Sequence, residues 1–193
     1  MMQEGGTVQV TSEYRVYSIR WVQLLVYFLS IFANALHGMT FVPIIDQTKE
    51  YFQISITQVN ILATIFLFLY TIGTLISIWF SKQYSLRFVT VIGATLNLGV
   101  FIRLYSFVNP HQGYAALLIG QIFSAIAAPF FLNTTALFAA RWFPLSQRDI
   151  ATVIGSMGNP LGKLNYFLIR IYIRFKLYDY RNSYRIVSTF IDR

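Results

Sequence analysis

Residues 59–80 read VNILATIFLFLYTIGTLISIWF, and this stretch decides the fold because it contains no charged side chain. A bilayer core about 30 Å thick is crossed by roughly 20 predominantly apolar residues in helical form. The stretch is apolar on every face, whereas a helix on the surface of a soluble domain carries one apolar stripe. We therefore predict that this segment crosses a lipid bilayer as an α-helix.

The rest of the chain has a similar character. Of its 193 residues, 56% are hydrophobic and 11% are charged, its mean hydropathy is +0.56, and it has no cysteine. Charged residues make up about a quarter of an average soluble domain, so an ordinary soluble domain is excluded. Four more stretches predict crossings, and the fold class is an all-α, polytopic transmembrane helix bundle: 21–45, 88–108, 114–140, and one from residue 150 past Gly162.

The basic residues predict how the bundle lies in the bilayer, because Lys and Arg are enriched in cytoplasmic loops. Six of them lie before the first span or in the second and fourth connections: Arg15, Arg20, Lys82, Arg87, Arg141 and Arg148. The first and third connections hold only Lys49. We expect residues 1–20 to be cytoplasmic and residues 21–162 to be five membrane helices, in the plasma membrane or an endolysosomal membrane.

Polar side chains inside membrane spans are costly and usually face a bundle interior or a cavity. Asn34 and His37 lie one turn apart, and we expect Thr40 to continue their helical face. This face lines a substrate cavity or makes interhelical hydrogen bonds, and the sequence leaves both readings open. Gln121 and Asn159 are candidates for the same cavity, whereas Asn97 is expected to join helices by hydrogen bonding.

Arg103 lies 16 residues after Arg87, which is about 24 Å along a helix. We expect its side chain to extend to the outer headgroups, as long basic side chains near helix ends do.

Small residues recur at intervals that allow helices to approach closely: Gly120, Ser124, Ala128, Gly158 and Gly162. Pro129 and Pro160 are expected to interrupt their helices, as prolines do in many transporter helices.

Several classes of site and partner are not expected. The sequence has no glycine-rich phosphate loop, catalytic serine arrangement or paired carboxylates, so we predict that the protein is not an enzyme and needs no cofactor. A metal site is not expected, because the only histidine besides His37 is His111, in a loop. Nucleic acid is not expected as a partner, because residues 1–162 carry a net charge of only +3 and residues 163–193 carry +5.

Several segments resemble the major facilitator superfamily, and within it the carriers related to the feline leukaemia virus subgroup C receptor. They are YRVYSIRW at 14–21, Asn34-Ala35, SLRFVTVIGATLN at 85–97 with Arg103 after it, Gly120-Gln121, and RWFPLSQRDIATVIGSMGNPLG at 141–162. The resemblance covers residues 14–162. It implies an amino-terminal half of a carrier, with structural or gating roles for Arg87, Arg103, Arg141, Trp142, Arg148, Pro160 and Gly162.

The resemblance also implies a small organic solute, because members of this group are linked to choline, ethanolamine and haem movement. Two positions depart from the choline-handling pattern. Gly38 stands where those members have a tryptophan, a residue suited to holding a quaternary ammonium, and Pro160 stands where they have a glutamine. The superfamily's acidic residue after the second helix is also missing, with Lys82 near its place.

Residues 163–193 differ from the rest in composition, with no Ala, Gly, Pro, Gln or Glu. They form either a basic amphipathic segment on the membrane surface or a read-through or alternative exon, and we favour the second interpretation.

Carriers of this superfamily use twelve helices in two halves, so we expect a truncated form of a solute transporter that does not transport alone. The alternative is a membrane interaction protein or regulator that associates with a full-length carrier chain.

Overall fold

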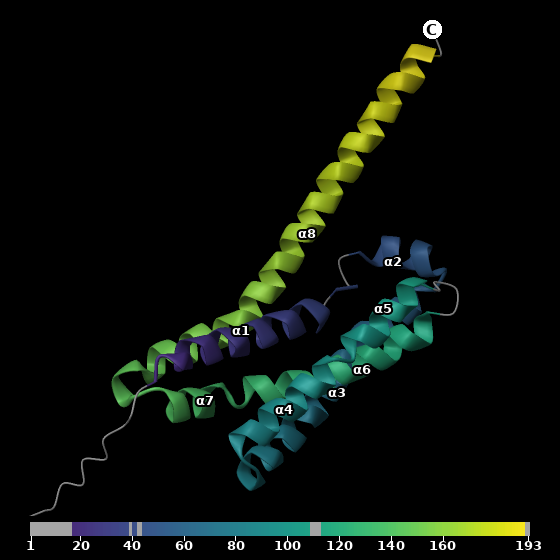
Figure 1. Ribbon diagram of the computed structural model, residues 1–193. Coiled ribbons are helices and arrows are strands. Elements are labelled where there is room, and N and C mark those ends of the chain that lie inside the picture. Colours follow the sequence, from purple (N-terminus) through teal and green to yellow (C-terminus); the bar gives the residue numbers. More distant parts are fainter. Residues whose placement is uncertain (1–16, 39, 42–43, 109–112, 192–193) are drawn as a thin grey trace, which may run out of the picture.

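The computed structural model describes residues 17–38, 40–41, 44–108 and 113–191. Within these ranges the regular structure is helical, which confirms the predicted all-α bundle (Figure 1). The elements in chain order are α1 (Ile19–Gly38), α2 (Ile45–Phe52), α3 (Ile56–Gln83), α4 (Leu86–Asn97), α5 (Val100–Val108), α6 (Tyr114–Leu132), α7 (Thr135–Trp142), the 3₁₀ turn η1 (Leu145–Gln147) and α8 (Arg148–Ile191). Arg15 and residues 109–111 of the third connection lie outside the described residues.

Four helical stretches of the described chain are long and apolar enough to cross a membrane: Ile19–Gly38, Ile56–Gln83, Leu86–Val108 and Tyr114–Leu132. They correspond to the first four predicted spans. The region of the expected fifth span is helical and opens α8, but it does not belong to these four. Asn159 and Lys163 lower the hydropathy of that part of α8. The helix runs through Gly162 to Ile191 without a break, so the compositional change after Gly162 does not coincide with a structural boundary.

The first predicted span is too long at its carboxyl end. α1 ends at Gly38 rather than continuing to Ile45, so Thr40 lies beyond the helix and does not extend the face of Asn34 and His37. The carbonyls of His37 and Gly38 at this end accept hydrogen bonds from the Arg103 and Gln121 side chains instead of from a further helical turn.

The third and fourth predicted spans are divided. The third is split into α4 and α5 at Leu98, whose N–H donates to the Thr95 carbonyl in a 3₁₀-like turn. The fourth is split after Leu132, where the Thr134 hydroxyl donates to the Phe130 carbonyl at 2.6 Å. Side-chain bonds of this kind compete with regular helical bonding and often bend helices.

The two prolines do not end their helices where interruptions were expected. α6 continues through Pro129 to Leu132, and α8 continues through Pro160. Membrane helices tolerate proline because neighbouring groups and local adjustments satisfy the freed backbone carbonyls.

α6 is the central helix of the bundle. In the most apolar part of α6, 56% of the residues are buried inside the protein, compared with 28% or less in the other three candidate spans. Many large apolar side chains of those other helices are exposed, as expected where lipid is the solvent. Two apolar clusters lie along the bundle: one joins α1, α4, α6, α7 and α8 around Tyr27 and Phe143, and the other joins α2, α3 and α6 around Leu62 and Leu117.

α1 and the first half of α8 lie side by side, and the rest of α8 extends away from the other helices (Figure 1). Glycines make this approach close. A Cβ atom added at Gly158 would lie 2.7 Å from the Phe28 carbonyl oxygen, and one at Gly162 would lie 2.7 Å from the Ala35 Cβ. The predicted close-packing role of Gly158 and Gly162 is therefore confirmed.

Gly158→Leu is expected to destabilise the protein by about 1–3 kcal/mol or more, because inserted methylenes overpack a tight contact. Thermal or denaturant unfolding in detergent micelles measures the change. Ser156→Leu is the control, since Ser156 is exposed on the same helix. Equal stability of the two variants would contradict the close α1–α8 contact.

Candidate functional site

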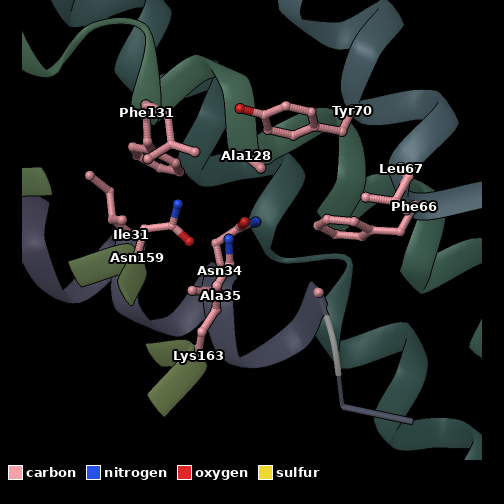
Figure 2. A pocket seen from close by; sticks show the side chains of 12 residues that line it. Ile31, Asn34, Ala35, Phe66, Leu67, Tyr70, Ala128, Phe131, Asn159 and Lys163 are labelled. Carbon is pink, nitrogen blue, oxygen red and sulfur yellow. The ribbon is translucent and has the colours of Figure 1, made fainter. Parts of the chain in front are cut away.

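A cavity of about 190 Å³ lies where four helices meet (Figure 2). Binding pockets for drug-sized ligands measure about 300–1,000 Å³, so this volume suits a small solute. The lining comes from α1 (Ile31, Asn34, Ala35, Gly38), α3 (Phe66, Leu67, Tyr70), α6 (Ala128, Phe131, Leu132) and α8 (Asn159, Lys163).

Polar groups converge on one side of this cavity. Figure 2 shows Asn159 and Lys163 pointing from α8 into the cavity toward Asn34 of α1. Residues 159 and 163 are four apart, and side chains at this spacing share one face of a helix. Gly158 and Gly162, on the adjacent face of α8, pack against α1. The α1–α8 contact therefore places the three polar side chains together.

Asn34 also joins three helices. Its amide nitrogen donates to the Asn97 Oδ1 of α4 at 2.9 Å and to the Ser124 carbonyl of α6 at 2.9 Å. Asn97 in turn donates to the Ser30 carbonyl at 3.4 Å. The expected interhelical role of Asn97 is confirmed. Asn34 makes the interhelical hydrogen bonds of one reading and also lines the cavity, whose role as a substrate site stays a prediction.

The other three candidates lie elsewhere. Thr40 donates to the Leu36 carbonyl at 2.6 Å. Gln121 is 1% exposed and donates to the Gly38 carbonyl at 3.1 Å, behind the end of α1. His37 lies on α1 one turn from Asn34 but does not line the cavity. Of the five candidates, the structure brings Asn34 and Asn159 together and leaves His37, Thr40 and Gln121 outside.

The expectation that Arg103 reaches the outer headgroups is wrong. Its side chain is 5% exposed, and it donates to the His37 carbonyl at 2.9 Å. Its guanidinium lies 4.8 Å from the centre of the Phe41 ring, a cation–π geometry. Gly120 makes room for it, since a Cβ atom there would lie 2.2 Å from the Arg103 Cγ. Arg103 and Gln121 thus bind the last carbonyls of α1, which a helix leaves unsatisfied.

The other residues with an expected structural or gating role lie away from the cavity, except Pro160 and Gly162, which lie near it. Arg87 and Arg141 are exposed at the ends of α4 and α7, and Trp142 packs on the cluster around Phe143. Arg148 donates from its Nε to the Phe143 carbonyl at 3.1 Å, closing the turn into α8. Pro160 is exposed, and Gly162 packs on α1 beside the cavity.

Lys163 was not among the predicted site residues, because the change in composition assigned it to the segment after Gly162. Its distance of one helical turn from Asn159 was the available signal. Phe66 and Tyr70 were also missed, because the sequence does not distinguish an aromatic residue that lines a cavity from one that faces lipid.

Comparisons with known proteins agree on one family. A sequence model described as "Major Facilitator Superfamily" matches residues 24–186. Solute carrier family 49 member A3 of Xenopus tropicalis is 34% identical over 159 residues, 79% of this chain and 33% of that protein.

Two further relatives are named for the solutes they carry. Choline/ethanolamine transporter flvcr2a of Danio rerio is 28% identical over 87% of this chain and 36% of its own length. Choline/ethanolamine transporter FLVCR1 of Mus musculus is 26% identical over 78% of this chain and 27% of its own length. The chain spans about a third of the length of these relatives.

Asn34→Ala is expected to lower stability by about 1–2 kcal/mol, because it removes two interhelical hydrogen bonds of the kind that bind membrane helices together. Asn97→Ala is expected to cost less, since besides the shared bond it removes only the longer 3.4 Å bond to the Ser30 carbonyl and leaves the 2.9 Å bond to Ser124 intact. The double variant should be more stable than the sum of the single losses predicts, because both remove one shared bond. Unfolding of the four proteins in mixed micelles measures this coupling, and strict additivity would contradict the Asn34–Asn97 bond.

Proposed function

Because the chain belongs to the major facilitator superfamily, we propose that it forms part of a secondary carrier and holds a small organic solute in the cavity between α1, α3, α6 and α8. The single observation that carries this proposal is the convergence of Asn34, Asn159 and Lys163 on a cavity whose other lining side chains are apolar except for the Tyr70 hydroxyl. Ligand sites have this character, with a mainly apolar lining and a few placed polar groups.

The break between α6 and α7 supports the same site. Phe131 and Leu132 line the cavity directly before the break, and Pro129 supplies no N–H to the helix one turn earlier. Transporter sites are typically formed by interrupted helices near the middle of the membrane. The cavity lies beside the interruption in this bundle.

We propose the following orientation in a plasma or endolysosomal membrane: the end of the bundle that holds Arg20, Arg87 and Arg148 faces the cytoplasm. Leu24, Leu86 and Phe143 belong to one apolar cluster, which places these basic residues at a common end. Asp46 and Glu50 lie in α2, near the other cluster. Positive charge is favoured on the cytoplasmic side.

A second candidate function is association with another carrier chain. The support is the exposed apolar side of α8 after Lys163, where Leu164, Leu168 and Ile171 lie on a helix that extends away from the bundle (Figure 1). Co-purification of a tagged copy with a carrier of the same family, lost in a triple substitution of these residues to Ser, tests it.

Asn159→Ala is expected to weaken solute binding about tenfold, since a good hydrogen bond in a largely apolar site is worth about 1.4 kcal/mol. Protein in lipid nanodiscs is screened with small organic anions, cations and neutral solutes by thermal shift, and the affinity of each hit is then measured. Ser156→Ala, on an exposed position of α8, is the control and should bind as the original protein does. The cavity is not a solute site if the two variants bind every hit equally well.

Single introduced cysteines test the orientation, because the chain has none of its own. Glu50→Cys in α2 is expected to react with a membrane-impermeant maleimide added to sealed, right-side-out vesicles. Ser85→Cys, between α3 and α4, should react only after permeabilisation. The reverse pattern would contradict the proposed orientation.

A further inference from the structure

Lys163 brings a positive charge to the cavity. It lines the cavity together with Asn34 and Asn159, and Figure 2 shows its side chain extending from α8 toward Asn34. Lys163 is exposed, so its ammonium group is accessible to an entering solute. Its place is set by Gly162, the preceding residue, which lies against the Ala35 Cβ and the Phe32 carbonyl of α1.

Among the residues that the structure describes, no acidic side chain lines this cavity. Asp46 and Glu50 lie in α2, packed near the cluster around Leu62. Asp149 opens α8 and stands 14 residues before Lys163, about 21 Å along a helix. Among the lining residues the charge of Lys163 is therefore not balanced by a carboxylate of the protein.

The donors for a negative charge come from Asn159 and Lys163. Asn159 has no hydrogen-bond partner among the described residues, and its amide points into the cavity beside Lys163. A side-chain amide offers two N–H donors and one acceptor oxygen, and a lysine ammonium offers three donors. The Asn34 nitrogen is occupied by Asn97 and Ser124, so Asn34 offers only its oxygen. The N–H groups of Asn159 and Lys163 together suit an oxyanion.

Apart from the Tyr70 hydroxyl, the rest of the lining is apolar. Ile31, Leu67 and Phe131 surround the cavity from three helices, and the Phe66 ring closes the side next to Gly38. A Cβ atom at Gly38 would lie 2.7 Å from the Phe66 Cζ, so the ring occupies the space beside that glycine. A solute that fits this cavity has a compact apolar body and one polar end.

We propose that the solute is a small organic anion, a carboxylate with an apolar body, whose carboxylate pairs with Lys163 and accepts a hydrogen bond from Asn159. This inference rests on the proposed solute site and adds the sign of the solute's charge. Ammonium and carboxylate attract, and the attraction is stronger beside apolar walls than in bulk water. The relatives named as choline/ethanolamine transporters are named for cations, and Lys163 repels a cation at this position.

The opposing chemistry is a cation held by the Phe66 and Tyr70 rings, because aromatic faces attract ammonium groups. Three probes with the same ring and nearly the same size separate these possibilities: phenylacetate, phenylacetamide and phenethylamine. Their binding to the full chain in lipid nanodiscs is measured by saturation-transfer NMR with competition. The proposal expects phenylacetate to bind about tenfold more tightly than phenethylamine, with phenylacetamide between them.

Variants at residue 163 attribute the preference to one side chain. Lys163→Gln is expected to weaken phenylacetate binding about tenfold and leave phenylacetamide unchanged, whereas Lys163→Arg retains phenylacetate binding. Lys82→Gln is the matched control, because Lys82 is exposed at the end of α3 and is expected to change nothing.

The outcomes separate this inference from the proposed function. Phenethylamine binding as well as or better than phenylacetate overturns the anion inference and leaves the solute site standing. Phenylacetate binding that is unchanged in Lys163→Gln overturns the assignment to Lys163. Failure of all three probes, together with failure of the wider solute screen, overturns the solute site itself.

Discussion

The close approach of α8 to α1 is the contact on which the site depends. Gly158 and Gly162 have no side chain, and their backbones lie against the Phe28 carbonyl and the Ala35 Cβ of α1. Without a hydrophobic driving force between helices in lipid, close packing supplies much of the association energy. Because Asn159 and Lys163 follow these two glycines directly, the same contact fixes where the polar groups of the cavity lie. The glycine contact with α1 and the polar lining of the cavity therefore come from the same short segment of α8.

A second set of contacts holds α1 to the central helix. Asn34 bonds to α4 and α6 in the middle of α1, while Arg103 and Gln121 bind the carbonyls of His37 and Gly38 at its end. The unsatisfied carbonyls at a helix end carry partial negative charge, so a buried guanidinium is favourable there. The position of α1 is therefore fixed by hydrogen bonds along its length on one side and by glycine packing on the other. The cavity lies between these two sides.

Much of this fold could be predicted from the sequence, and the reasons for the failures are physical. Residues 59–80 predict a membrane helix because the hydropathy of a segment can be read directly from its own residues. The split after Leu132 was missed because the sequence does not mark it. The Thr134 hydroxyl bonds back to the Phe130 carbonyl at the break, but the Thr90 hydroxyl makes the same kind of bond to the Leu86 carbonyl inside an unbroken helix. For Arg103, spacing along the helix gives its depth in the membrane but not the direction of its side chain. Asn34 and Asn159 were identified because polar residues in apolar spans stand out, whereas Lys163 was hidden by the change in composition after Gly162.

Gly38, which departs from the pattern of the choline-handling members, lies next to the Phe66 ring at one end of the cavity. A tryptophan at position 38, the residue expected by resemblance to choline-handling members, collides with the Phe66 ring as it stands. The aromatic ring next to the end of α1 thus comes from α3, and a larger side chain at position 38 requires the Phe66 ring to shift. On the opposite side, α8 contributes an ammonium group where a cation-binding site needs either a neutral or an acidic lining. The α1 end of the cavity carries a glycine and the α8 side carries an ammonium group, and this combination is the basis for proposing an anionic solute rather than a cation.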